Sequence, residues 1–464
     1  MSETARERPP PMPKQIPFII GNEACERFSF YGMRNILTVF LIDYLLVNVA
    51  PDEGARRAMA KANFHLFVSG VYFFPLVGGY LADRFLGKYR VILWLSVLYA
   101  CGHAMLALFE KSVTGFYAGL FLIALGSGGI KPCVSAMVGD QFDEATKERA
   151  KTVFAIFYWS INFGSFFASL LIPKTLKLYG PTVAFGIPGV LMAIAVVVFW
   201  AGRKLYVVVP PTGRDPHSFL RVVRSALSGA RAPGDHWLDR AKKQHPEESV
   251  EGTKAVFRVI AVFLPIPFFW MLFDQKASTW VVQAKSMDPQ VGPFTFEPSQ
   301  MQLVNPLLVM LLIPLTTGLV YPLAKKLGYE LVPLRRMTIG MVMGALSFVI
   351  AGLVNIPVEA GQRLSILWQI VPYVVLTVGE ILVSTTGLEF AYSQAPPTMK
   401  GTIMSLWNLT VTAANLTVAL ASALNVFTGS AQFFFYAGMA LCAAVALGLV
   451  ARRYRSHEWY QKRV

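Results

Sequence analysis

The chain is poor in the residues that build disulfide-bonded domains, metal centres and hydrolytic sites. It contains only four cysteines and six histidines in 464 residues, and they are scattered singly along the sequence. No cysteine spacing matches a metal site, and isolated cysteines in apolar stretches do not imply disulfides. No serine–histidine or metal-ligand cluster lies in those stretches. We therefore expect no enzyme activity, no metal and no organic cofactor.

Charged residues are also scarce. They make up 15% of the chain, whereas hydrophobic residues make up 55%, which excludes an ordinary soluble protein. The apolar runs are continuous rather than alternating, so they predict membrane-spanning helices and not a barrel. Twelve runs have the length of a span, at residues about 17–46, 62–82, 90–109, 114–138, 153–172, 183–202, 255–282, 301–324, 336–354, 364–393, 402–424 and 431–451.

Acidic residues are fewer than basic ones, with 27 against 42, and the net charge of +15 could indicate a nucleic-acid partner. However, most lysines and arginines fall in alternate loops, which is the asymmetry that orients membrane proteins. We expect both termini to be cytoplasmic, the basic loops to contact membrane lipid, and no nucleic acid to bind. The N-terminus lacks the apolar core and cleavage site of a signal peptide, so the first span is expected to act as its own insertion signal.

One long polar segment divides the apolar spans into two sets of six. The sequence predicts a cytoplasmic N-terminal tail at 1–15, a six-helix bundle at 16–202, a linker at 203–254, a second bundle at 255–451 and a cytoplasmic tail at 452–464. The linker has an amphipathic pattern at 216–228, which is typical of a helix on a membrane surface. The turn GGYLADRFLGKYR at 78–90 resembles the loop between the second and third spans of the major facilitator superfamily, and a weaker copy follows the eighth span.

The first span carries four charges, on Glu23, Glu26, Arg27 and Arg34. A charge at membrane depth costs roughly 2.5–3.5 kcal/mol, so such residues usually face a partner or a polar cavity. At 100° per residue, these four and Tyr31 lie on one face of the helix about 140° wide. Glu23 and Arg27 can pair across one turn. Two acids and two bases exceed what a single structural ion pair needs, so the pattern indicates a functional site.

Further ionisable residues lie in both predicted bundles. Lys131 in the fourth span needs a carboxylate or a cavity, and Glu389 in the tenth span is its natural counterpart. Asp274 lies in a broken, aromatic seventh span. His65 lies near the external end of the second span, where it could titrate near neutral pH or be an ordinary buried histidine. Asn162 could line a cavity or only join two helices.

Four motifs together resemble the proton-coupled oligopeptide transporter family (POT/PTR) of the major facilitator superfamily. The first, EACERFSFYG at 23–32, is similar to the ExxER signature of that family, although Phe30 stands where the pattern often has tyrosine. The others are GGIKP at 128–132, FWMLFDQKASTW at 269–280 and GLEFAYSQAP at 387–396. The large external domain of the animal members is missing between spans nine and ten, so the chain resembles a prokaryotic member.

The resemblance implies twelve transmembrane helices in two six-helix bundles, and import of di- and tripeptides driven by protons. It implies proton coupling by Glu23, Glu26, Arg27 and Lys131. We further expect an external gate formed by Arg34 and Asp274, with help from His65. Substrate-binding residues would include the cations and the acid that face the two peptide termini, together with polar and aromatic groups around them. These are Arg27, Tyr31, Arg34, Tyr72, Lys131, Asn162, Trp280, Asn305, Glu389, Ser393 and Trp407.

We expect the two bundles to rock about a central site in the cell's inner (plasma) membrane, with the protein acting as a monomer. A peptide transporter needs a cationic and an anionic pole to hold a zwitterion, and spans one, four and ten supply them. Two alternatives stay open: a proton-coupled transporter of nitrate or another small acid, and a drug/proton antiporter of the same fold. No pore motif indicates an ion channel.

Overall fold

The computed structural model describes residues 12–143, 146–228, 236–394, 396 and 399–454. Most of the two predicted tails, 1–15 and 452–464, lies outside the described residues. Two compact units make up the chain: unit 1 is Met1–Pro51 with Phe74–Gly213, and unit 2 is Asp52–Phe73 with Arg214–Val464. The first part of the second helix thus groups with unit 2, whereas the sequence places it in the first bundle. The bundle boundaries themselves stay a prediction.

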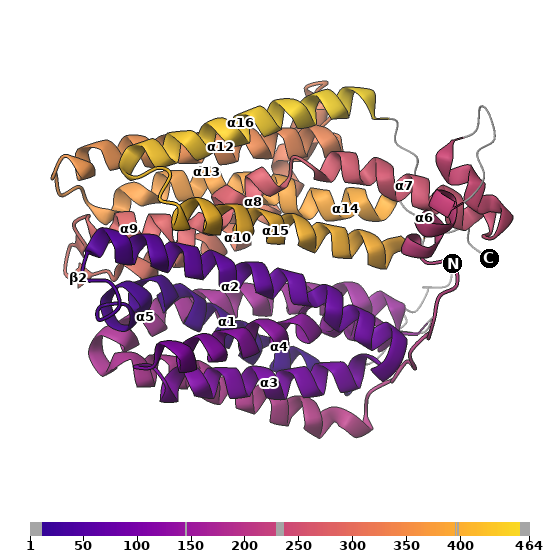
Figure 1. Cartoon of the computed structure of the whole chain (residues 1–464), viewed down its shortest axis with the longest axis horizontal. Helices are drawn as coiled ribbons and strands as arrows, with labels where there is room; N and C mark the ends of the chain where they lie inside the picture. Colours follow the sequence, from indigo (N-terminus) through magenta and orange to yellow (C-terminus); the bar gives the residue numbers. More distant parts are fainter. Residues whose placement is uncertain (1–11, 144–145, 229–235, 395, 397–398, 455–464) are drawn as a thin grey trace, which may run out of the picture. The chain divides into compact units, whose positions relative to one another are not determined.

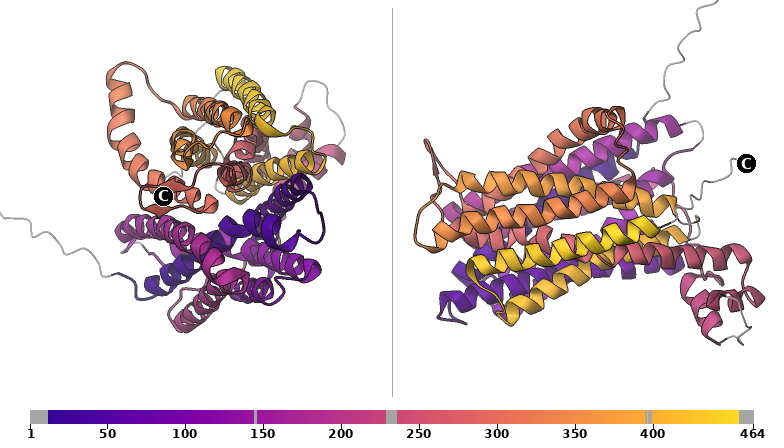
Figure 2. Two further views of the ribbon diagram at one scale, coloured as in Figure 1. Left: turned by 90° about the vertical axis from the view of Figure 1, so that its left-hand side faces the viewer. Right: turned by 90° about the horizontal axis from the view of Figure 1, so that it is seen from above.

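Unit 1 is formed by long helices that run in roughly one direction (Figures 1 and 2). Its elements are α1 (Ile16–Phe40), which continues as a π-helical turn (Leu41–Leu45), the end of α2 (Glu53–Leu81) with a π-helical turn (Ala82–Leu86), α3 (Lys88–Leu108), α4 (Val113–Asp140), α5 (Lys147–Ala201) and a 3-10 turn (Gly202–Lys204). The α5 helix is bent at Gly180, where φ is +80° and proline follows.

Unit 2 contains more interrupted helices. Its elements after the first part of α2 are α6 (Phe219–Ser228), α7 (Glu247–Phe263), α8 (Pro267–Asp274), α9 (Thr279–Lys285), the hairpin strands β1 (Gln290–Val291) and β2 (Phe294–Thr295), α10 (Val304–Leu315), α11 (Tyr321–Lys326), α12 (Pro333–Glu359), α13 (Ile370–Glu380), α14 (Thr386–Ser393), α15 (Lys400–Ala423) and α16 (Gly429–Arg453). Its 3-10 turns are Trp237–Lys243, Gln275–Ala277, Pro298–Leu303 and Ile366–Gln369, and its π-helical turns are Thr316–Val320 and Ile381–Thr385.

The described helices account for twelve membrane crossings. Nine of the described helices are long and apolar enough to span a membrane. The bent pair Glu247–Phe263 and Pro267–Lys285, counted as one span, is the tenth. One of the nine, Thr152–Lys204, has 53 residues and would measure about 80 Å, so with its bend at Gly180 it crosses twice. The α1 helix supplies the twelfth crossing; its polar and charged residues make it less apolar than the other spans.

Small residues allow the helices of unit 1 to pack closely. The α1 helix packs on α5, and α3 packs on α4. The Gly128 residue of α4 faces the backbone of Phe74 in α2, where an added Cβ would lie only 2.6 Å from the Phe74 carbonyl carbon. Such close approach of backbones is how membrane helices gain packing contacts without a hydrophobic driving force.

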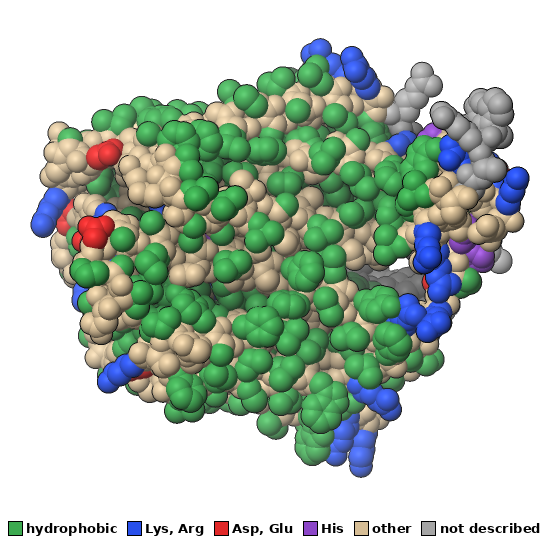
Figure 3. Space-filling model, in the orientation of Figure 1, with side chains coloured by type: hydrophobic (Ala, Val, Ile, Leu, Met, Phe, Trp, Pro, Cys, Tyr) green, Lys and Arg blue, Asp and Glu red, His purple; other side chains and the backbone are tan. Residues whose placement is uncertain are grey.

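In unit 2, α12 packs on α16 and on α13, around a core rich in aromatic and methionine side chains. Hydrophobic side chains also cover much of the outward surface of the helices, while lysines and arginines lie toward helix ends (Figure 3). Leu108 in unit 1 is 75% exposed, and Leu353 in unit 2 is 56% exposed. Exposed apolar surface of this extent fits helices that face lipid.

The linker contains a small packed cluster of its own. The α6 helix lies inside the segment for which an amphipathic helix is predicted, and its Val222 and Ala226 pack against Leu238, Ala241 and Val250. The α7 helix begins at Glu247, before the predicted start of the second bundle, because the charged residues there continue the helix into the linker.

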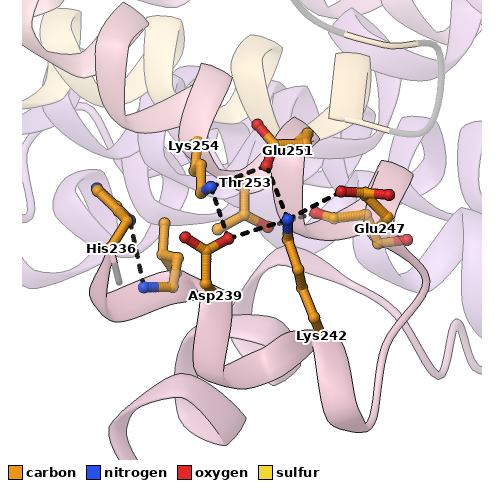
Figure 4. A network of polar contacts seen from close by, with 9 residues as sticks. His236, Asp239, Lys242, Glu247, Glu251, Thr253 and Lys254 are labelled. Carbon is orange, nitrogen blue, oxygen red and sulfur yellow. Dashed lines mark hydrogen bonds and ion pairs between the residues drawn. The ribbon is translucent and has the colours of Figure 1, made fainter. Parts of the chain in front are cut away.

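A network of ion pairs joins the linker to α7 (Figure 4). Lys242 Nζ lies 2.8 Å from Glu247 Oε1 and 3.2 Å from Asp239 Oδ1, and Lys254 Nζ lies 2.8 Å from both Asp239 Oδ1 and Glu251 Oε1. The two carboxylates beside Lys242 raise the pKa of its ammonium group. These pairs hold the 3-10 turn Trp237–Lys243 on the first turns of α7.

Candidate functional site

The first cluster of the site lies on α1 in unit 1. Arg27 Nε lies 2.6 Å from Glu23 Oε1 and 3.1 Å from Glu26 Oε2. Glu23 is 1% exposed and Glu26 is fully buried. The spacing of one helical turn brings Glu23 onto the guanidinium, as the sequence predicts, and the contact of the same group with the adjacent Glu26 is an addition from the structure. Arg27 therefore contacts two buried acids, and these three groups, counted without the nearby Lys131, carry one excess negative charge when all are ionised.

Lys131 enters unit 1 from α4 and lies beside the same helix. Its Nζ lies 4.6 Å from the centre of the Phe30 ring, a cation–π contact. Phe30 is the position at which the sequence departs from the family signature, and its ring also packs edge-on against Tyr31. Because this residue is phenylalanine and not tyrosine, the Lys131 ammonium group meets an aromatic face of α1 that carries no hydroxyl group.

Other predicted residues of unit 1 are buried within it. Arg34 is 6% exposed on α1. Asn162 of α5 donates from Nδ2 to the Tyr158 carbonyl at 3.0 Å, which is a bond within its own helix. Beside Arg34, Asn35 donates to Ser169 Oγ and ties α1 to α5.

The second cluster lies in unit 2 and links His65 to Asp274. Asn415 Nδ2 donates to Asp274 Oδ2 at 2.8 Å, and Asn415 Oδ1 lies 2.7 Å from His65 Nδ1. His65 Nε2 lies 2.7 Å from Ser278 Oγ. All four side chains are buried. Because the amide oxygen can only accept, His65 Nδ1 carries a hydrogen, and Nε2 accepts from Ser278 when the ring is neutral.

The sequence identified His65 and Asp274 but not the residues that join them. Asn415 and Ser278 are separated from His65 by 350 and 213 positions, so no local pattern places them together. The only indication in the sequence is that Ser278 follows Asp274 by one helical turn and so shares its helix face. The predicted pairs Arg34–Asp274 and Lys131–Glu389 would join the two units and stay predictions.

The third cluster surrounds Asn305 at the start of α10. Lys276 Nζ donates to Asn305 Oδ1 at 2.6 Å, and Asn305 Nδ2 donates to Glu380 Oε2 at 2.6 Å and to Thr377 Oγ1 at 3.0 Å. Asn305 and Lys276 are buried and Glu380 is half-buried. The sequence singled out Asn305, but not the lysine and the acid that hold it.

The remaining predicted residues of unit 2 differ in their surroundings. Trp280 lies fully in the core, with its ring centre 4.9 Å from that of Tyr373 and 5.6 Å from that of Phe348. Trp407 is buried against Trp270. Glu389 is exposed on α14, and Ser393 Oγ donates to the Phe390 carbonyl.

Tyr72 lies near the end of the α2 part that belongs to unit 2 and packs, half-buried, against the core of that unit. Of the predicted substrate-binding residues of unit 2, the structure places Trp280 and Trp407 in packed aromatic surroundings and Asn305 in a polar network. Their contact with a substrate stays a prediction.

Comparison with known proteins gives matches over most of the chain. A family model described as the POT family matches residues 89–435. Solute carrier family 15 member 2 of Mus musculus is 38% identical over 368 residues, which cover 75% of this chain and 49% of that protein. The chain spans about half the length of the curated relatives it matches. The expected prokaryotic origin stays a prediction, since these relatives are from animals.

Two solved structures match the whole chain closely. A crystal structure of an auto-inhibited POT family peptide transporter is 48% identical, with a TM-score of 0.91, over 97% of this chain and 99% of that one. An in meso crystal structure of the POT family transporter PepTSo is 49% identical, with a TM-score of 0.91, over 96% and 99% of the two chains. These matches confirm the predicted fold of twelve transmembrane helices in two six-helix bundles.

Proposed function

Because this chain belongs to the POT family, we propose that it is a proton-driven symporter that imports di- and tripeptides by alternating access. The resemblance found in its four motifs is thereby confirmed, and the family consists of multi-pass membrane transporters rather than enzymes. One of the matching structures is described as a peptide transporter, and it matches this chain almost from end to end. That match supports the proposal for the whole chain.

The observation that carries the proposal is the sharing of Arg27 by Glu23 and Glu26. A buried carboxylate without a full counter-charge is costly, and two acids beside one base cannot both stay ionised cheaply. A proton on either acid removes the excess negative charge. The cluster is therefore a suitable carrier for one transported proton.

A short peptide is a zwitterion, and the chain offers charges of both signs for its ends. Arg27, Arg34 and Lys131 are candidate partners for the peptide carboxylate, and Glu389 for the amino group. Charge-assisted hydrogen bonds to the termini are strong and do not depend on the peptide's side chains. Aromatic and uncharged residues around them, such as Tyr31, Tyr72 and Trp407, would tolerate many side chains.

Coupling follows if proton and peptide change the same ion pairs. When Glu23 or Glu26 is protonated, Arg27 is released from one carboxylate and can bind that of the peptide. When the acid is ionised, it competes with the peptide for that cation. We propose that residues 16–202 and 255–451 rock against each other in this cycle, and that Arg34, Asp274 and His65 form the external gate.

The proposal includes no cofactor other than the coupling proton. It places the protein in the inner (plasma) membrane with both termini in the cytoplasm, because the basic residues lie in alternate loops. It takes the single chain as the working unit. The basic linker, with its short amphipathic helix, would lie on the cytoplasmic surface in contact with lipid.

Uptake of labelled dialanine into proteoliposomes tests the function. We expect accumulation above the external concentration only when an inward proton gradient is imposed, and competition by unlabelled di- and tripeptides. Nitrate and cationic drugs, tested as competitors, should have no effect. Uptake that nitrate blocks and peptides do not would contradict the proposal, as would efflux of a drug in exchange for protons.

A further inference from the structure

The polar network around Asn305 joins three helices of unit 2 through a lysine and an acid that the proposed transport cycle does not use. Lys276 lies in the 3-10 turn that interrupts the seventh span between α8 and α9, Asn305 begins α10, and Glu380 ends α13. The Lys276 ammonium group also lies 3.3 Å from the centre of the Phe273 ring. Its position is therefore fixed both by an aromatic face and by the Asn305 oxygen.

The hydrogen bonds in this network allow only one orientation of the Asn305 amide group. An ammonium group can only donate, so Lys276 must face the amide oxygen, and a carboxylate can only accept, so Glu380 must face the amide nitrogen. Thr377 donates its own hydroxyl hydrogen to the Tyr373 carbonyl at 2.8 Å, so toward Asn305 it can only accept. All three neighbours thus agree on the same orientation.

This orientation determines what Asn305 can offer to a substrate. Both N–H bonds of the amide group are used, by Glu380 and Thr377, whereas the oxygen accepts from Lys276 and keeps one lone pair. Asn305 is 8% exposed, so it is largely withdrawn from water. A buried amide group held in this way can accept a hydrogen bond from an N–H group and cannot donate one.

We propose that Lys276 and Glu380 are positioning residues that hold Asn305 as a hydrogen-bond acceptor for an N–H group of the peptide. This inference rests on the proposed peptide transport and adds a specificity element to it. The lysine and the acid neutralise each other through the amide group, which explains how both persist in a membrane-spanning bundle. Their role is to orient Asn305, and they need not touch the substrate.

Two double variants separate orientation from charge. In Lys276→Gln/Glu380→Gln, one amide side chain can still donate to the Asn305 oxygen and the other can still accept from its nitrogen. In Lys276→Glu/Glu380→Lys, the total charge is kept but the donor and the acceptor change places. The Asn305 amide group is then expected to rotate so that its oxygen and nitrogen exchange positions. We measure the KM for dialanine in counterflow exchange, together with the thermal unfolding midpoint in detergent.

We expect the first double variant to keep the KM within about threefold, and the second to raise it at least about tenfold with the maximal rate nearly unchanged. In an Asn305→Leu background, the exchange of the two charges should have no further effect on KM. If the charge-exchanged protein does not fold, Lys276→Met replaces it, with an expected KM at least about tenfold above that of Lys276→Gln.

A wild-type KM in the charge-exchanged variant overturns the inference. So does an equal loss in the Asn305→Leu background, because Lys276 and Glu380 would then act independently of Asn305. In both cases the unaltered protein still exchanges dialanine, so the proposed function stands. Absence of dialanine exchange by the unaltered protein overturns the proposed function and this inference with it.

Discussion

A single guanidinium group, that of Arg27, contacts two buried carboxylates on the same helix. The proposed chemistry of the protein depends on this imbalance, because it makes the state of charge of α1 sensitive to one proton. Lys131 supplies a further cation nearby, held over the ring of Phe30. These contacts allow two predictions at the scale of single residues.

The first prediction concerns the paired acids. Glu26→Gln and Glu23→Gln should each abolish accumulation of dialanine driven by a proton gradient, because an amide group cannot carry the transported proton. Counterflow exchange, which needs no net proton movement, should persist. Uptake assays in proteoliposomes measure both. Asp43→Asn, which removes an exposed acid just beyond α1, is the matched control and should keep uphill uptake. Uphill uptake in both glutamine variants would refute the assignment.

The second prediction concerns the cation of α4. Lys131→Ala should reduce uptake of ordinary dipeptides by at least about tenfold, because a charge-assisted hydrogen bond contributes about 1.5–3 kcal/mol. Lys111→Ala removes an exposed lysine of the same unit and should leave uptake unchanged. Equal uptake by the Lys131 variant and the unaltered protein would exclude both a substrate-binding and a coupling role for this lysine.

Sequence reasoning identified the residues of the site better than their partners. Glu23 and Arg27 lie one turn apart, so helical spacing alone predicts their contact, whereas it does not predict the contact between the adjacent residues Glu26 and Arg27. Helical spacing could not assign the partners of Asn415 and Lys276, because those partners are on other helices. The hydrogen bonds also involve the side-chain amide groups of Asn415 and Asn305, whose neighbours the sequence does not give. Trp280 is a predicted substrate-binding residue; its indole contacts the rings of Tyr373 and Phe348, and its contact with the substrate stays a prediction. Periodicity cannot distinguish such core packing from a cavity wall.

At the scale of helices, a close approach of two backbones can be tested where α2 crosses α4 in unit 1. Gly128→Ala should lower the thermal unfolding midpoint in detergent, because its Cβ would lie 2.6 Å from the Phe74 backbone and the helices must separate. Overpacking of this kind costs about 1–3 kcal/mol. Gly186→Ala places a methyl group in open space on α5 and should be neutral or stabilising. Equal midpoints for the two variants would contradict the close crossing.

The stability of the linker should depend on pH. His245 Nδ1 lies 3.0 Å from His217 Nδ1, and Ser225 of α6 contacts the other ring nitrogen of His245 at 2.8 Å. Burial, followed by the nearby His217 and Arg221, lowers the pKa of His245, and Asp215 opposes this effect only partly. Because the pKa is lower in the folded linker than in the unfolded one, stability is full above about pH 6.5 and falls as the pH drops below it.

Limited proteolysis between pH 8 and pH 5 measures this effect. Cleavage within the linker should become faster below about pH 6.5. One Nδ1 of the His217–His245 contact must accept a hydrogen bond, and protonation of that nitrogen breaks the contact between the two rings. In His245→Gln the pH dependence should be largely lost, whatever the absolute rate of cleavage. Constant protection of the unaltered linker across this pH range would show that the histidine pair does not hold α6 in place.

At the scale of the whole molecule, composition was sufficient to predict a twelve-helix membrane protein, because apolar runs of span length are hard to place elsewhere. The sequence predicts a broken seventh span and separate spans at 153–172 and 183–202, but not how sharply each segment bends. The seventh span bends by 49° between α7 and α8, and α5 runs through two crossings with a bend at Gly180. Proline and glycine mark these places, but similar residues also occur inside straight helices, so tertiary packing decides which of them break.

The central claim is that peptide and proton move together because they compete for the same buried charges. The reciprocal flux tests it most directly: proteoliposomes containing a pH-sensitive dye receive dialanine outside with no initial pH gradient, and with the membrane potential clamped. The account predicts that the interior becomes acidic as dialanine enters, and that Glu26→Gln exchanges dialanine without this acidification. Entry of dialanine into vesicles with the unaltered protein and no change in internal pH would contradict it.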